Sequence, residues 1–228
     1  MEETVNWKNN AFGHKFITSF SGGKDSVLAL YKAMKVGEAI GLIVMLEEEG
    51  KRSRSHGMPP ELIQAQAKSI GLPIYTGVAS WEEYEKVFIQ LLANAKKQGA
   101  DVLVTGDLDM PVKDCWHDKI TKNVGLKLSM PLWAMNHREA VDEFINRGFK
   151  TIVVTVNLSL GMREEDLGRM LTHDYVKELE SRGIDPCGES GEFHTTVIDG
   201  PIFNYPIKVK KCEIIKDGEY AYLPLELA

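Results

Sequence analysis

The segment SFSGGKDS, at positions 19–26, has residue types that together bind a phosphate group. Two consecutive glycines let backbone N–H groups converge on one anion, and the lysine, the aspartate and two of the three serines add a cation, a potential metal ligand and hydroxyl donors. These residues are Ser21, Gly22, Gly23, Lys24, Asp25 and Ser26. The segment lacks the GxxxxGK[ST] spacing of a Walker A loop. It therefore predicts a phosphate loop of another kind.

A predicted strand, 15–20, comes immediately before this loop, and a predicted helix with one apolar face follows it and stops at Gly37. The amino-terminal end of a helix carries free N–H groups and the positive end of the helix dipole. Both stabilise a bound anion. The flanking elements therefore support phosphate binding at this point of the chain.

The same alternation of strand and helix continues along the first two-thirds of the sequence. The strands are nearly continuous apolar runs, which is typical of a parallel sheet covered on both faces. We predict six such strands, at 15–20, 40–46, 73–78, 101–106, 126–131 and 149–158. Open parallel sheets bind ligands beyond the carboxyl ends of their strands, where the glycine loop lies.

Helix start and stop signals separate the strands. We predict helices at 60–70, at 81–97 with Ser80 and Glu83 as a capping box, at 113–123, from the cap Asn136 to before Gly148, and one or two between 161 and 182. Beyond them, 195–200, 203–215 and 219–225 indicate antiparallel strands. This change of pattern predicts two domains, 1–128 and 129–228.

Composition restricts the function classes. The chain has 228 residues, of which 43% are hydrophobic and 26% charged, typical of a globular protein. Three cysteines without CxxC spacing indicate a reducing, cytoplasmic location, and no apolar run approaches the roughly 20 residues of a membrane helix. Residues 1–10 are too polar for a secretory signal. A net charge of -6 argues against nucleic-acid binding, and we expect KRSR at 51–54 to be a solvated loop.

Several motifs carry a family resemblance. SGGKDS resembles the pyrophosphate loop of the N-type ATP pyrophosphatases, and four further segments are similar to the diphthine–ammonia ligase family. They are SHGMPPELIQAQAKSIGLPIYTG, TGDLD, MPLW and GESGEFHTTVIDGPIF, so the resemblance extends from Ser21 to Phe203. It implies an α/β fold: an adenine-nucleotide-alpha-hydrolase-like (HUP) parallel sheet with helices on both faces, plus a smaller mixed α/β C-terminal domain.

The resemblance also implies a reaction. ATP adenylates a carboxylate, that of diphthine in elongation factor 2, and ammonia then displaces AMP to form an amide. The expected cofactors are ATP and Mg²⁺, with Lys24 and Asp25 as catalytic residues. The expected nucleotide-binding residues are Ser21, Gly22, Gly23, Lys24, Asp25, Ser26, Gly106 and Asp107, and the expected substrate-binding residues are His56, Gly188, Glu189, Gly191, Glu192, Phe193, His194 and Thr195.

Diphthine carries a trimethylammonium group, so we hypothesise that Glu189 and Glu192 attract this cation. Phe193, Trp116 or Trp133 would face it through cation–π contact. The CWH segment, with Cys115 and His117, lacks a second ligand pair, so we predict no protein-held metal there.

Alternatives stay open. Many family members have an arginine-containing stretch between TGD and MPLW, whereas this chain has LDMPVKDCWHDKITKNVGLKLS. In a second interpretation, the protein is therefore an ATP pyrophosphatase that acts on a different acceptor, either a small carboxylate or a tRNA base. A third is a nucleotide-binding sensor without turnover. The ammonia source and a homodimer also stay open.

Overall fold

The computed structural model describes residues 6–54 and 56–228, and these form two compact units whose segments alternate along the chain. Unit 1 takes in the chain up to Phe20 together with Asp25–Glu49 and Leu72–Ala134. Unit 2 contains Ser21–Lys24, Gly50–Gly71 and Met135–Ala228. The start of the chain at 1–5 and Ser55 of the SHGMPP motif lie outside the described residues. The predicted boundary at 128/129 stays a prediction.

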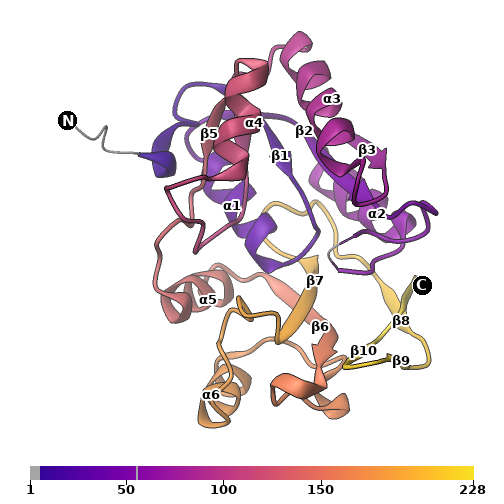
Figure 1. Cartoon of the computed structure of the whole chain (residues 1–228). Coiled ribbons are helices and arrows are strands. Elements are labelled where there is room, and N and C mark those ends of the chain that lie inside the picture. Colours follow the sequence, from indigo (N-terminus) through magenta and orange to yellow (C-terminus); the bar gives the residue numbers. More distant parts are fainter. Residues whose placement is uncertain (1–5, 55) are drawn as a thin grey trace. The chain divides into compact units, whose positions relative to one another are not determined.

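Unit 1 is built on a five-stranded sheet in the order β3-β2-β1-β4-β5, with every neighbouring pair parallel (Figure 1). The strands are β1 (Lys15–Ser19), β2 (Glu38–Leu46), β3 (Ile74–Val78), β4 (Val102–Val104) and β5 (Lys127–Ser129). They correspond to the first five predicted strands, so the parallel sheet is confirmed.

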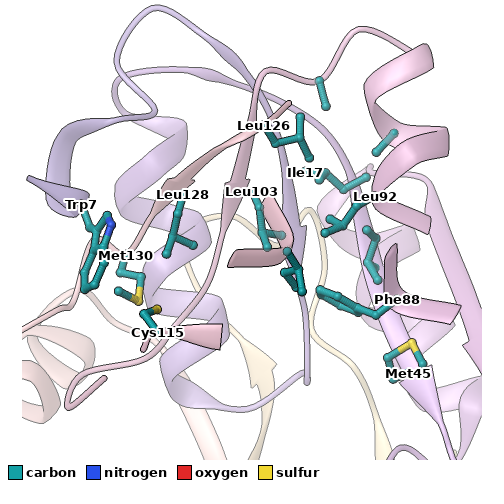
Figure 2. Close-up of a cluster of buried hydrophobic side chains, with 14 of the residues drawn as sticks. Trp7, Ile17, Met45, Phe88, Leu92, Leu103, Cys115, Leu126, Leu128 and Met130 are labelled. Carbon is teal, nitrogen blue, oxygen red and sulfur yellow. The ribbon is translucent and has the colours of Figure 1, made fainter. Parts of the chain in front are cut away.

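Helices cover both faces of this sheet. On one face α3 (Tyr84–Lys97) and α4 (Trp116–Val124) pack over an apolar cluster, which includes Ile17 and Leu103 from the strands and Phe88 from α3 (Figure 2). Apolar residues of α1 (Lys24–Met34) are buried outside that cluster, and Phe16 turns away from Ile17 towards the turn that ends α1. Burial on both faces explains the continuous apolar strands.

Unit 2 is mixed α/β, with antiparallel strands. A four-stranded sheet has the order β7-β6-β10-β9, and β8 pairs with β11. The strands are β6 (Lys150–Asn157), β7 (Phe193–Asp199), β8 (Val209–Lys211), β9 (Ile215–Asp217), β10 (Tyr220–Tyr222) and β11 (Leu225–Leu227), and the helices are α2 (Pro60–Ile70), α5 (His137–Asn146) and α6 (His173–Ser181). The predicted antiparallel tail is confirmed.

The sixth predicted strand does not belong to the parallel sheet. It forms β6, which lies between β7 and β10 and pairs antiparallel with both. Seven of its eight residues are buried, because it is an inner strand covered on both faces. A continuous apolar run indicates that a strand is buried but does not indicate its direction. The prediction that this strand continues the parallel series was therefore wrong.

Two predicted helices begin late. The helix predicted at 81–97 begins at Tyr84, after a turn in which Ser80 Oγ accepts the Glu83 N–H at 3.3 Å. The one predicted at 113–123 begins at Trp116, after Asp114 at a φ of 61°.

The long amphipathic stretch predicted at 161–182 is mostly not α-helical. The 3₁₀ turn η2 (Leu158–Leu160) comes just before it. The stretch itself contains the 3₁₀ turn η3 (Glu164–Asp166), then an extended segment in which Gly168 and Arg169 exchange backbone hydrogen bonds with Val153, and only then α6. Backbone pairing with β6 here replaces the helix that the periodicity indicates. No helix in the described ranges is long and apolar enough to cross a membrane.

Candidate phosphate-loop site

The strand order defines a ligand-binding edge in unit 1. From β1 the chain builds outward to β2 and β3, and then returns to the other side of β1 with β4 and β5. Ligands of open α/β sheets bind at the carboxyl ends of the strands where the order reverses, here between β1 and β4. A Cβ atom on Gly106, just after β4, would lie 2.7 Å from the Asp25 carbonyl carbon and the Ser26 nitrogen. Only glycine lets these predicted nucleotide residues approach so closely.

Asp107, the next predicted nucleotide residue, has a histidine partner. His117 Nδ1 lies 3.7 Å from Asp107 Oδ2. Burial lowers the pKa of His117, although the nearby Asp107 carboxylate raises it. Cys115 is buried, which raises the pKa of its thiol. In the described chain, no three His, Cys, Asp or Glu side chains gather in a way that could hold a metal ion.

In unit 2, the glycine loop Ser21–Lys24 lies along the edge strand β7. The Val197 N–H donates to the Gly22 carbonyl at 2.9 Å, and the Lys24 N–H donates to Thr195 Oγ1 at 3.2 Å. His56 Nδ1 lies 2.9 Å from the Thr195 carbonyl oxygen. The structure therefore joins SGGK, SHGMPP and GESGEFHTT, three motifs far apart in the sequence.

Gln66 of α2 fixes the loop, although it is not among the predicted site residues. Its Nε2 donates to the Gly22 carbonyl at 3.0 Å and to the Val197 carbonyl at 2.7 Å, and lies 3.2 Å from Thr196 Oγ1. Gly22 has a φ of 77°, and a Cβ atom there would lie 2.3 Å from Gln66 Oε1. One signal was present: Gln66 is four residues after Leu62 and so falls on the apolar face of its helix.

Lys24 directs its ammonium group towards the segment before β7. Its side chain is buried, with 4% exposed, and Nζ donates a hydrogen bond to the Cys187 carbonyl. The same nitrogen lies 5.4 Å from the centre of the Phe193 ring, within cation–π range. Phe193, which we expected to face a substrate cation, thus already faces a cation of the protein.

The GESG turn is shaped by its glycines and by Asp185. Gly188 and Gly191 have φ angles of 68° and 88°, in the left-handed region that favours glycine. Asp185 accepts hydrogen bonds from the Cys187 N–H at 2.9 Å and from the Glu189 N–H at 3.3 Å, and it lies 2.7 Å from His137 Nδ1. This carboxylate organises the turn, and it is not among the predicted site residues.

The two glutamates of the turn differ. Glu192 is buried, and its Oε2 accepts the Ser190 N–H at 3.0 Å, whereas Glu189 is exposed. Trp116 and Trp133 belong to unit 1, where Trp116 Nε1 donates to Glu85 at 2.6 Å and Trp133 Nε1 to the Met110 carbonyl at 2.9 Å. The cation hypothesis for these residues stays a prediction.

His56 packs directly on the phosphate loop. A Cβ atom on Gly23 would lie 2.3 Å from His56 Cε1. The centres of the His56 and His194 rings are 4.7 Å apart. Burial lowers the pKa of His56 to about 4; the Thr195 carbonyl raises it and the Lys24 charge lowers it further. The imidazole is therefore neutral near pH 7. A carbonyl oxygen only accepts, so Nδ1 carries the proton and Nε2 has the lone pair.

The parallel sheet, its strand order and the glycine loop before the first helix define the class: a nucleotide-binding α/β protein of the adenine-nucleotide-hydrolase type. Residues 14–128 match the diphthamide synthase N-terminal domain, and residues 136–228 match the diphthamide synthase C-terminal domain. The chain belongs to the diphthamide synthase family.

Relatives share low identity over most of this chain. The diphthine–ammonia ligase of Schizosaccharomyces pombe is 25% identical over 93% of the chain, and those of Bos taurus and Homo sapiens are 23% and 22% identical over 90%. The chain spans 39% of the S. pombe protein and 86% of each mammalian one. Among solved structures, a predicted subunit of tRNA methyltransferase from Methanocaldococcus jannaschii matches with a TM-score of 0.47 and 18% identity, covering 82% of this chain and 97% of that one.

Proposed function

We propose that this protein is an ATP-dependent ligase that amidates a carboxylate with ammonia and releases AMP and pyrophosphate, and that the acceptor is diphthine in elongation factor 2. The relatives named above support the reaction and the acceptor. The observation that carries the proposal is the direct hydrogen bonding between the phosphate loop and the family-specific β7 segment, from Val197 to Gly22 and from Lys24 to Thr195.

Amide formation from a carboxylate needs activation, because the carboxylate is a poor electrophile and its oxygen a poor leaving group. Bound ATP would supply an AMP leaving group. The task of this chain is to hold the phosphates and to neutralise the charge that develops on the departing pyrophosphate. We assign this task to the loop backbone and to Lys24.

The donors of the loop fit a phosphate. The Gly23 N–H donates to Ser21 Oγ at 3.3 Å and the Lys24 N–H to Thr195 Oγ1 at 3.2 Å, both longer than the usual N–H···O distance of about 2.9 Å. An anionic phosphate oxygen is a stronger acceptor than a hydroxyl. A bound phosphate can therefore take over these donors, while the two hydroxyl groups become further donors.

Mg²⁺ would be held mainly by the nucleotide, since this ion uses one or two carboxylates and completes its shell with phosphate oxygens and water. Asp25 is the candidate carboxylate, because it lies in the first turn of α1 and against Gly106. Asp107, which follows Gly106, is the second candidate.

His56 is placed to orient a reactant. With a pKa of about 4, its imidazole is neutral near pH 7, so Nδ1 keeps its proton and Nε2 can accept a hydrogen bond. Its Nε2 lone pair suits an N–H of the incoming ammonia. We therefore assign His56 a positioning role.

A second candidate function keeps the chemistry and changes the acceptor. The stretch between Gly106 and Met130 contains no arginine, unlike that of many family members, so its acceptor contacts differ. A small carboxylic acid is the acceptor in this alternative. The net charge of -6 argues against a tRNA acceptor.

The experiment measures AMP and pyrophosphate released from Mg-ATP and ammonium, with and without diphthine-bearing elongation factor 2. Lys24→Met is expected to lower acceptor-dependent release by about 100-fold or more, as loss of a transition-state donor does. The control, Lys97→Met, removes an exposed lysine of α3 and should have no effect. ATP binding without acceptor-dependent release would contradict the proposal and favour a nucleotide sensor.

A further inference from the structure

Unit 2 contains a cavity of about 370 Å³ that the sequence motifs do not predict. Its walls are largely apolar and include Met58, Val154, Leu223 and Leu225. This volume falls at the lower end of the range for pockets that hold small organic molecules, about 300–1,000 Å³. The cavity is therefore of the right size for a side chain or a small metabolite.

One end of the cavity adjoins the phosphate loop through His56. His56 lines the cavity, and the same imidazole packs against Gly23. A molecule in the cavity that contacts His56 therefore has that end next to the loop that we assign to the ATP phosphates. An acceptor carboxylate must be in such a position to be activated.

Polar groups of the cavity suit a carboxylate. Thr155 lines it with 3% of the residue exposed, and its buried Oγ1 has no hydrogen-bond partner within the described part of the chain. A buried hydroxyl without a partner carries a desolvation cost, which a ligand oxygen would offset. Arg52 also lines the cavity, and its guanidinium can bind a carboxylate with two parallel hydrogen bonds.

We propose that this cavity is the acceptor site, and that it binds a carboxylate carried on an apolar body. The body lies between Met58, Val154 and Leu223, and the donors of Thr155 and Arg52 bind the carboxylate. Carboxylate binding by the cavity can be measured without turnover. Only the assignment of the bound carboxylate as the acceptor rests on the proposed ligase function. It differs from the expected site at Glu189 and Glu192.

The cavity also has groups that would contact a substituent on the body. Tyr222 offers one aromatic ring, and Glu226 and Arg52 supply charges of opposite sign. A trimethylammonium group, as in diphthine, and an uncharged group of the same shape are thus two sources of the same carboxylate chemistry. They are separated by a matched pair of probes, 2-(trimethylammonio)butanoate and its carbon isostere 2-ethyl-3,3-dimethylbutanoate.

A native thiol reports binding. Cys212 lines the cavity and is a partly exposed free cysteine, whereas Cys115 and Cys187 are buried, with 2% and 1% exposed. In the folded protein, N-ethylmaleimide should therefore alkylate Cys212 first, and Cys212→Ser should abolish this fast phase. Either carboxylate probe is expected to slow the alkylation, with half-protection at about 1 mM or below for a ligand of this size. The corresponding alcohol, 2-ethyl-3,3-dimethylbutan-1-ol, should protect much less.

Two variants test the carboxylate contacts. Arg52→Gln should raise the concentration for half-protection about tenfold or more, while the neighbouring Lys51→Gln, outside the cavity, should leave it unchanged. Thr155→Val keeps the shape of the side chain and removes the hydroxyl, so it should weaken protection without lowering Tm. Because Arg52 is exposed, its variant remains informative even if the Thr155 variant folds poorly.

The outcomes separate the two proposals. Protection by the trimethylammonium probe alone supports a quaternary acceptor such as diphthine, protection by the isostere alone supports an uncharged acid, and protection by both supports the shared chemistry. If neither probe slows alkylation, or if the alcohol protects as well as the acids, the cavity proposal is wrong even where AMP release with elongation factor 2 succeeds. Protection without AMP release from any acceptor would retain the cavity and contradict the ligase.

Discussion

At the scale of single residues, His56 shows how burial changes the chemistry of a side chain. A histidine on the surface titrates near 6.5, but the His56 ring packs on Gly23 and its pKa falls to about 4. The ring is neutral because burial and the nearby Lys24 ammonium both disfavour the imidazolium, more than the hydrogen bond to the Thr195 carbonyl favours it. The same packing fixes the tautomer. A neutral acceptor is therefore held beside the phosphate loop at physiological pH.

The pH dependence of stability follows from this pKa. Between about pH 6.5 and 4 the unfolded chain binds a proton at His56 and the native chain does not, so His56 makes the native state less stable as pH falls through this window. Above pH 6.5 it has no effect. We expect His56→Gln to reduce the slope of the unfolding free energy against pH in this window by up to one proton. Urea denaturation at several pH values measures the slope, with His14→Gln as control. An unchanged slope in His56→Gln would contradict the low pKa.

At this scale, the sequence indicates part of the candidate site. The residues Gly22, Gly23 and Lys24 follow from their types, because few loops need two glycines and a lysine before a helix. Gln66 and Asp185 could not be found in this way, since their roles depend on backbone groups of β7 and of the GESG turn that only folding brings to them. The apolar helix face on which Gln66 lies was the one available signal.

At the scale of elements, α2 holds the phosphate loop against β7 through one side chain. We expect Gln66→Leu to leave the carbonyl groups of Gly22 and Val197 without this donor and to destabilise unit 2 by about 2 kcal/mol. Because the loop loses its support, the KM for ATP should rise more than kcat falls. Thermal unfolding and steady-state kinetics measure the two effects.

The matched control for this prediction is on the same helix. Gln64 is exposed, so Gln64→Leu makes the same chemical change away from the loop and should alter neither Tm nor KM. If the two variants behaved alike, the loop would not depend on α2.

A second element carries a cap that the sequence predicted. Asn136 Oδ1 accepts the Glu139 N–H at 3.2 Å, which confirms Asn136 as the N-cap of α5. We expect Asn136→Ala to cost about 1 kcal/mol of unfolding free energy. The control variant is Asn123→Ala. Asn123 is exposed inside α4, where alanine favours a helix, so no loss of unfolding free energy is expected. Equal losses in the two variants, measured by urea denaturation, would argue against the cap.

Elements were predicted well where local signals set their limits. Gly71, at a φ of 82°, ends α2 where the sequence placed a stop, and its N–H donates to the Ala67 and Lys68 carbonyls. β6 was predicted as a strand but assigned to the wrong sheet, because strand partners depend on distant segments. The stretch after Gly161 was predicted as helix, because its periodicity does not show that Gly168 and Arg169 pair with Val153.

At the scale of the whole molecule, the two compact units are built from alternating segments. β7 is an edge strand, and its outer side receives the loop at 21–24 while Gln66 of α2 binds its Val197 carbonyl. An exposed strand edge otherwise presents unpaired backbone groups. The loop and α2 both come from the first third of the chain, whereas β7 comes from the last third. A single domain boundary in the sequence therefore divides unit 2 into two pieces.

This arrangement makes the predicted boundary at 128/129 testable. A fragment of residues 129–228 keeps the antiparallel sheets but lacks 21–24 and 50–71, so β7 loses its hydrogen bonds to Gly22 and Gln66, and β11 loses its contact with α2. We expect this fragment to show no sharp thermal transition by near-ultraviolet circular dichroism, whereas the full chain does. Adding a separate 1–128 fragment should restore the transition, because it supplies the missing segments. A 129–228 fragment that unfolds as sharply as the full chain would show instead that this region folds as an independent domain.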